Sequence, residues 1–318
     1  MARPPDSAAV LFPGALGDFM CFLPTLHALR ERHSGQLLLV AKSELLDLVE
    51  IPALGAASVD RREIADLFAV DGDPAPATRA LFDGFDSVYS WTGFGDVGFS
   101  QRLAATSRGR VSVYRFRGMR PGEHAVDYYA RCVGLDPSPL GAPSVRLDRD
   151  WLAAFKRQHQ LDARSIIVFH PGSGSHKKNW RGFEAVIQYW RQQHADAIVL
   201  VRGPAEAGNT MRSQSGVVVV DGISLPQVAA LLADRTIYLG NDSGISHLAG
   251  AVGAYAVVLF GPSDPGTWAP RGARVHVVHA LNPCPVCLET FCLHRLPVET
   301  VIRALEVQRR IAARSVEL

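Results

Sequence analysis

Short apolar runs and longer helical patterns alternate along nearly the whole chain, and this alternation restricts the fold more than any other feature. The runs are rich in Val, Ile and Leu, which is typical of parallel strands buried on both faces. Parallel strands need helical crossovers between them. The chain is therefore predicted to be an α/β protein of the doubly wound, Rossmann-like class. Strands are expected over Ala8–Phe12, Leu37–Ala41, Ser87–Trp91, Val111–Phe116, Ile166–His170, Ala197–Arg202, Val217–Asp221, Thr236–Gly240, Ala254–Phe260 and Val275–His279, and helices include Asp18–His33, Ser43–Val49 and Glu123–Val133.

The stretch Leu135–Asp150 interrupts the alternation, and it is heavy in proline and turn-forming residues, as interdomain linkers are. With 318 residues, 47% of them hydrophobic, the chain can build two cores of ordinary size. We expect two Rossmann-like domains, residues 1–147 and 148–296, and an amphipathic closing helix within 297–318. Ligands of such sheets bind beyond the carboxyl ends of the strands, which predicts an interdomain cleft.

The overall charge and the length of the apolar runs narrow the class of protein. The formal net charge of +2 gives no general attraction for nucleic acid, so no nucleic-acid partner is expected. The first residues do not follow a signal-peptide pattern, and no apolar run approaches about 18 residues. These features predict a cytoplasmic protein.

A glycine-bearing turn follows the first expected strand. Gly14 and Gly17 let the backbone turn sharply and approach a ligand closely, and Asp18 stands where the next helix begins. The spacing is not the G-x-G-x-x-G of dinucleotide-binding turns, which disfavours a nicotinamide enzyme. Two interpretations of Asp18 stay open: its carboxylate caps the helix, or it accepts a proton from a sugar hydroxyl.

A loop of small residues follows the strand expected to end at His170. Ser173, Gly174 and Ser175 leave backbone N–H groups accessible, and Lys178 offers an ammonium that can neutralise a departing diphosphate. An ordinary strand-to-helix loop with solvated lysines is the alternative. In the next loop, Glu206 offers two acceptor oxygens to ribose hydroxyls, or it is simply an exposed residue at a helix start.

The segment Thr236–Pro265 has the pattern strand, polar turn, helix, strand. Ser243 and Gly244 open the helix, where unpaired backbone N–H groups and the helix dipole favour an anion such as phosphate. Asp242 or Ser243 could equally serve as the helix cap. His247 lies one turn into the helix, either as a structural hydrogen-bond partner or against the donor.

Four soft or borderline metal donors lie close together near the carboxyl end of the chain. They are Cys284, Cys287, Cys292 and His294, and the first two have the C-x-x-C spacing that suits zinc or iron. The alternative is a set of reduced thiols packed under the last helix.

Three of these blocks together resemble glycosyltransferase family 9, the family of heptosyltransferases that act in lipopolysaccharide core assembly. The blocks are Leu16–Asp18, the His170-Pro171-Gly172 loop that leads to Lys178-Asn179-Trp180, and Asp242–Leu248, which is similar to the family's D-[ST]-G-x-S-H signature. The resemblance implies a GT-B fold whose second domain holds the donor nucleotide and whose first domain holds the acceptor. It also implies metal-independent transfer of heptose from ADP-heptose, with inversion and with Asp18 as general base.

The resemblance implies further roles and partners. It assigns Lys178 to the diphosphate, Asp242 and its turn to the phosphates or sugar, and Glu206 to the ribose. The acceptor would be a glycan, lipid-linked or protein hydroxyl, and a lipid-linked acceptor would add peripheral association with the inner membrane. Catalysis needs no cofactor, but some members carry a late Cys-rich segment, so zinc or iron at the cysteine cluster would be structural. The donor-binding set is Gly17, Ser173, Gly174, Ser175, Lys178, Glu206, Asp242, Ser243, Gly244 and His247.

Two alternatives to a transferase stay open. One is a non-catalytic protein that binds a nucleotide sugar, in which Asp18 is only a helix cap. The other is a nucleotide-dependent oxidoreductase on tandem Rossmann domains. Arg115, Arg117 and Arg120 form a modest basic cluster, which suits an anionic acceptor in the transferase hypothesis.

Overall fold

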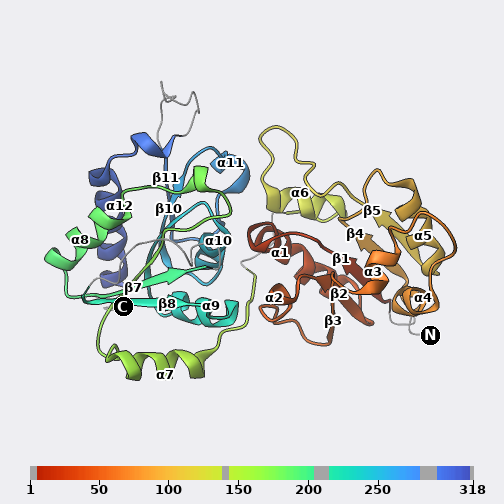
Figure 1. Cartoon of the computed structure of the whole chain (residues 1–318), viewed down its shortest axis with the longest axis horizontal. Coiled ribbons are helices and arrows are strands. Elements are labelled where there is room, and N and C mark those ends of the chain that lie inside the picture. Colours follow the sequence, from red (N-terminus) through yellow and green to blue (C-terminus); the bar gives the residue numbers. More distant parts are fainter. Residues whose placement is uncertain (1–5, 138–142, 204–214, 280–291, 316–318) are drawn as a thin grey trace. The chain divides into compact units, whose positions relative to one another are not determined.

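The computed structural model describes residues 6–137, 143–203, 215–279 and 292–315. The chain forms two compact units, residues 1–143 and residues 144–318 (Figure 1). Each unit is built on one parallel sheet with helices on both faces, which confirms the predicted doubly wound α/β class. The unit boundary lies inside the stretch Leu135–Asp150, and a helix begins at Arg149.

The first unit has five parallel strands in the order β3-β2-β1-β4-β5. They are β1 (Ala8–Leu11), β2 (Leu37–Ala41), β3 (Leu54–Ser58), β4 (Ser87–Ser90) and β5 (Arg110–Val113). The apolar pattern does not predict β3, because this edge strand is largely accessible and its sequence LGAAS has a single large apolar residue. The strand expected over Val111–Phe116 begins at Arg110 and ends at Val113.

Two layers of helices cover the first sheet, and Figure 1 shows them on opposite faces. On one face α1 packs against α6, and Phe12 stacks on Phe22 of α1 with ring centroids 4.3 Å apart. On the other face Ala9 and Leu11 share a core with residues of α3, α4 and α5. The helices are α1 (Leu16–Arg32), α2 (Ser43–Leu46), α3 (Arg62–Asp66), α4 (Pro76–Phe82), α5 (Val97–Thr106) and α6 (Ala125–Cys132).

The second unit has six parallel strands in the order β11-β10-β9-β6-β7-β8. All six were expected from the sequence, and their bounds agree to within one residue. Three of them, the neighbouring strands β6, β9 and β10, are buried along their whole length, as expected for central strands of a parallel sheet. The strands are β6 (Ile166–His170), β7 (Ala197–Arg202), β8 (Val217–Asp221), β9 (Ile237–Asn241), β10 (Tyr255–Phe260) and β11 (Val275–His279).

Helices also cover both faces of the second sheet (Figure 1). On one face α8 and α12 bury Trp190, Val301 and Leu305 against β6, β9 and β10. On the other face α9 packs against α10. None of the described helices is long and apolar enough to cross a membrane. The helical elements are α7 (Arg149–His159), η1 (His176–Lys178), α8 (Phe183–Gln193), α9 (Leu225–Ala233), α10 (Gly244–Ala251), α11 (Pro265–Trp268), η3 (Leu293–Arg295) and α12 (Val298–Arg314).

The order of strands reverses once in each sheet. In the first unit the chain moves outward from β1 to β2 and β3, and then returns to place β4 on the other side of β1. In the second unit the same reversal lies between β6 and β9. Loops that leave the carboxyl ends of such neighbouring strands diverge to opposite faces, which leaves room for a ligand between them. The two reversals are therefore the positions at which each unit can bind a ligand.

Candidate functional site

The turn after β1 delivers Asp18 to the carboxyl end of the first sheet. A Cβ atom on Gly14 would lie 2.4 Å from Cε1 of Phe12 and 3.0 Å from Cβ of Asp18, so only glycine fits this tight turn. The cap of α1 is Ala15, which makes no side-chain cap bond, and Asp18 lies in the first turn of the helix. In the described part of the chain the Asp18 carboxylate accepts no backbone N–H bond, which disfavours the capping interpretation.

Arg117 holds the Asp18 carboxylate from a distant part of the chain. Its Nε donates to Oδ1 at 3.1 Å and its second terminal nitrogen donates to Oδ2 at 2.9 Å, so both oxygens are engaged. The Asp18 side chain is only 7% exposed, whereas that of Arg117 is 57% exposed. The hydrogen bond to Asp18 raises the pKa of Arg117, so the guanidinium stays charged.

Two tyrosines of α6 fix the backbone next to Arg117. The Tyr128 hydroxyl donates to the carbonyl of Arg115, and the Tyr129 hydroxyl donates to the carbonyl of Phe116 at 3.4 Å. Burial raises the pKa of Tyr129, and the negative charge of Asp18 raises it further, so this hydroxyl remains a donor. The segment before Arg117 is thus anchored by its main chain, and its arginine side chains are left at the surface.

The second unit brings its site together at the reversal between β6 and β9. His170 at the end of β6 is paired in register with Gly240, so the residues after these two strands leave the sheet side by side. Asn241 ties the two exits together, because its Nδ2 donates to the carbonyl of Pro171 at 2.6 Å and its Oδ1 accepts from the backbone N–H of Trp180 at 3.2 Å. The Asn241 side chain is fully buried.

Lys178 and Asp242 form an ion pair across this reversal. The Lys178 Nζ donates to Oδ2 of Asp242 at 2.6 Å, and their side chains are 31% and 6% exposed. Lys178 ends the one-turn helix η1, whose entry is shaped by the Ser173 hydroxyl, 2.7 Å from both the carbonyl of Ser175 and Oδ1 of Asn179. Gly174 between the serines is exposed, with open space around it.

The start of α10 lies directly after Asp242. Ser243 is the cap of this helix, and its Oγ accepts from the backbone N–H of Ser246 at 3.4 Å. The N–H groups of Gly244 and Ile245 have no hydrogen-bond acceptor among the described residues, so they remain available to an anion. The capping and anion-binding interpretations of this turn are therefore compatible. His247 is buried one turn further along.

The remaining predicted residues belong to different parts of the chain. Gly17 lies with Asp18 in α1 of the first unit, whereas the other described members of the predicted donor-binding set belong to the second unit. Glu206, Cys284 and Cys287 lie outside the described residues. Trp180 packs in the core of the second unit and donates from Nε1 to the carbonyl of Leu296 at 3.1 Å, so it supports the fold.

The described members of the expected metal cluster do not share an environment. Cys292 is buried and His294 is exposed on η3. The part of the chain that the structure describes contains no group of three or more residues that could hold a metal ion. The proposal of a structural zinc or iron thus receives no support from the residues that the structure shows.

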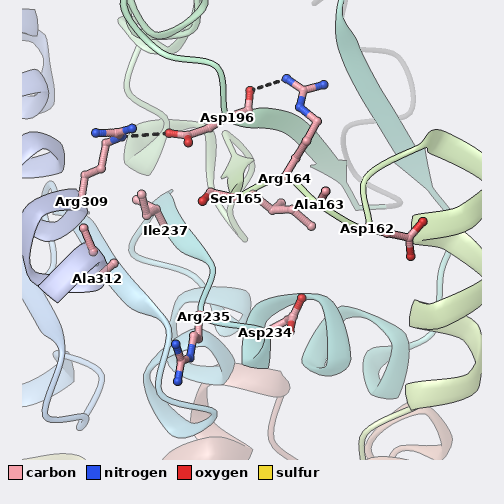
Figure 2. A pocket seen from close by; sticks show the side chains of 12 residues that line it. Asp162, Ala163, Arg164, Ser165, Asp196, Asp234, Arg235, Ile237, Arg309 and Ala312 are labelled. Carbon is pink, nitrogen blue, oxygen red and sulfur yellow. Dashed lines mark hydrogen bonds and ion pairs between the residues drawn. The ribbon is translucent and has the colours of Figure 1, made fainter. Parts of the chain in front are cut away.

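A cavity of about 360 Å³ lies at the opposite, amino ends of β6 and β9 (Figure 2). In its lining, Asp196 accepts from Arg309 at 3.1 Å through its side chain and from Arg164 at 3.0 Å through its carbonyl. Parallel sheets bind ligands at their carboxyl ends, so we assign no role in catalysis to this cavity.

Sequence reasoning missed two residues of the site. Arg117 appeared only as one member of a basic cluster, because it lies 99 residues from its partner Asp18 and no local pattern connects them. Asn241 directly precedes the D-S-G turn and is not among the predicted site residues, although its side chain bonds the loop after β6. An amide residue at the end of a fully buried strand is the signal that could have identified it.

Comparison with known proteins identifies the family to which this chain is similar. The sequence model of glycosyltransferase family 9 (heptosyltransferase) matches residues 106–296. Lipopolysaccharide heptosyltransferase 1 of Pseudomonas aeruginosa is 28% identical over 203 residues, which cover 59% of this chain and 54% of that protein. The match therefore spans about half the length of this relative.

Solved structures agree over almost the whole chain. The family 9 glycosyltransferase of Veillonella parvula matches with a TM-score of 0.74 at 22% identity, covering 95% of this chain and 97% of that one. ADP-heptose lipopolysaccharide heptosyltransferase II of E. coli matches with a TM-score of 0.69 at 18% identity, covering 95% and 98%. These likenesses confirm the predicted GT-B fold.

Proposed function

Because this chain belongs to glycosyltransferase family 9, the heptosyltransferase family, we propose that it transfers a heptose from ADP-heptose to a hydroxyl of a lipopolysaccharide-core acceptor. The donor follows from the name of the E. coli relative, and the acceptor from that of the Pseudomonas relative. The transfer inverts the anomeric carbon and uses no metal. Family membership removes the oxidoreductase alternative.

The second unit binds the donor in this proposal. The ammonium of Lys178 and the free N–H groups of Gly244 and Ile245 gather at the reversal between β6 and β9, and together they suit the two phosphates of a nucleoside diphosphate. Asp242 carries the same sign of charge as the phosphates, so it orients Lys178 and does not itself bind them. Ser173, Gly174 and Ser175 border the same end of the sheet, where Ser173 and Ser175 bond each other within the loop and Gly174 is exposed.

The first unit supplies the base. The acceptor oxygen attacks the anomeric carbon, its proton passes to the Asp18 carboxylate, and the bond between that carbon and the diphosphate breaks with its electron pair leaving on ADP. Lys178 and the start of α10 stabilise the negative charge that develops on the leaving group. A carboxylate has about four lone-pair sites, so Asp18 retains lone pairs beside its two bonds from Arg117.

The observation that carries the proposal is the environment of the Asp18 carboxylate. Its carboxylate is buried at the carboxyl end of the first sheet, and its partner is a cation and not the helix backbone. A capping residue would bond its own helix, whereas a general base needs to be oriented and shielded from bulk water. The geometry of Asp18 fits the second description.

The test measures transfer and donor binding separately. We expect Asp18→Asn to lower the rate of heptose transfer by roughly 10²–10⁴-fold, the usual contribution of a general base, with ADP affinity unchanged in calorimetry. Lys178→Ala should lower ADP affinity instead. The matched controls are Asp150→Asn, an exposed carboxylate in the first turn of α7, and the exposed neighbour Lys177→Ala.

Three results would contradict the proposal. Full transfer by Asp18→Asn would remove Asp18 as the base. ADP binding by the wild type without any transfer to a lipopolysaccharide-core acceptor would favour the non-catalytic alternative. Loss of transfer in the presence of a chelator such as EDTA would overturn the metal-independent mechanism.

A further inference from the structure

A basic hollow of about 540 Å³ lies beside the Asp18–Arg117 pair, beyond the carboxyl ends of β4 and β5. Three arginines contribute to its lining, and they differ in how they are engaged. Arg131 is held by both oxygens of Glu123 at 2.6 and 2.8 Å, and Arg117 is held by Asp18. Arg115 lies over the ring of Phe94 at 5.2 Å and has no acidic partner within the described residues.

The Asp18–Arg117 pair is asymmetric in its access to solvent. The carboxylate is almost fully enclosed, and the guanidinium is the exposed member that also lines the hollow. Because the tyrosine hydroxyls of α6 hold the main chain at Arg115 and Phe116, the side chain of Arg117 can move without a change in its backbone. An anion in the hollow would have Arg115 as a partner and would compete with Asp18 for Arg117.

We propose that Arg117 couples the base to the acceptor: an anionic oxygen group of the acceptor, bound between Arg115 and Arg117, draws the guanidinium from Asp18 and frees the carboxylate to take a proton. The inference rests on the proposed transferase function. A carboxylate relieved of a neighbouring cation accepts a proton more readily, so the base becomes effective when the acceptor is in place. Arg117 is thus a positioning residue with a second contact to substrate.

This coupling protects the donor from water. A free Asp18 could activate a water molecule, whose oxygen would bond to the anomeric carbon while its proton passed to Asp18 and the electron pair of the broken bond left on ADP. With Arg117 on both carboxylate oxygens, that hydrolysis is suppressed until an anion arrives. The prediction is a wild-type enzyme that hydrolyses ADP-heptose slowly by itself.

The experiment follows ADP release from ADP-heptose in the absence of acceptor. Arg117→Ala should hydrolyse the donor roughly tenfold faster than the wild type, since a released base contributes at least that factor. The double variant Asp18→Asn/Arg117→Ala should return to the background rate. The matched control is Arg108→Ala, which removes another two-bonded arginine–aspartate pair, with Asp83 at 2.8 and 3.1 Å, from an exposed position in the same unit.

Small anions test the same coupling on the unaltered protein. Acetate and inorganic phosphate stand for a carboxylate and a phosphate group of the acceptor, and sodium chloride of equal ionic strength is the reference. We expect one of the two to stimulate wild-type hydrolysis several-fold and to leave Arg117→Ala unaffected, and the stimulating anion identifies the group. Arg117→Lys keeps the charge but cannot engage both oxygens, so its rate of donor hydrolysis should lie between those of the wild type and Arg117→Ala.

The outcomes separate this inference from the proposed function. Unchanged or reduced hydrolysis in Arg117→Ala, in a protein that melts like the wild type and still binds ADP, would overturn the coupling and leave Arg117 as a permanent support of the base. No transfer by the wild type with any lipopolysaccharide-core acceptor would overturn the function itself.

Discussion

Replacement of Asn241 by alanine should destabilise the second unit and weaken donor binding together. The buried side chain makes two hydrogen bonds, to the carbonyl of Pro171 at 2.6 Å and from the N–H of Trp180 at 3.2 Å. A buried polar group left without its partner costs about 1–3 kcal/mol. Trp180 is deeply buried, so water cannot replace its lost partner, whereas Pro171 is half-buried and its carbonyl can bond water. We expect Asn241→Ala to lower the free energy of unfolding by about 3 kcal/mol in total.

The predicted loss is large enough to measure by calorimetry. For a unit of this size each kcal/mol lowers Tm by roughly 2–4 °C, which gives a decrease of roughly 6–12 °C. Both bonds also hold the loop that carries Lys178, so ADP affinity should fall by roughly tenfold, or about 1.4 kcal/mol. Asn241→Asp keeps the acceptor for Trp180 and should keep part of the stability.

Asn179→Ala is the matched control. Among the described residues, the half-buried amide of Asn179 accepts one hydrogen bond, from the Ser173 hydroxyl, and that hydroxyl also contacts the carbonyl of Ser175. Its Tm should change by less than about 2 °C. An equally small change in Asn241→Ala would refute the reasoning, since it would show that the two loops are held together by other contacts.

Two further predictions concern the first unit. Gly14→Ala places a Cβ atom 2.4 Å from the ring of Phe12, so it should lower the free energy of unfolding in denaturant by about 1–3 kcal/mol. Transfer should also fall, because this turn carries Asp18. Gly84→Ala, with open space around it, should leave stability unchanged, and equal stabilities of the two variants would contradict the packing argument. Burial lowers the pKa of His33 below 6.5, and pairing with Asp6 offsets only part of this effect. The unfolded chain therefore binds the proton more tightly than the folded chain does, and the protein loses stability as the pH falls below about 6.5. The decrease in Tm between about pH 7.5 and pH 5.5 should be smaller in His33→Gln, and an identical decrease would exclude His33 as its source.

Strands that are buried on both faces were predictable from the sequence. β6, β9 and β10 consist of apolar runs, and a run of Val, Ile and Leu between turn-forming residues has few alternatives to a central strand. The half-exposed β3 and the short helices α3, α4 and α5 were not predicted. Their apolar faces are narrow, and packing against β1 and β2 stabilises them more than local propensity does.

The sequence by itself also determined which residue types stand at the ends of the strands. The glycines before Asp18, the small loop before Lys178 and the turn before Gly244 are local patterns, because backbone turns and helix starts depend on a few consecutive residues. What these groups contact was decided by the tertiary structure alone. Lys178 meets Asp242 only because β6 and β9 are neighbours, although 64 residues separate the two side chains.

Arg117 reaches Asp18 for a similar reason, since the chain leaving β5 returns beside the start of α1 after 99 residues. A contact of this kind depends on strand order and on the direction in which each loop leaves the sheet, and neither is encoded in a local stretch of residues. The sequence therefore determined the chemical groups that each turn presents, and the folded sheets decided which of them act as pairs.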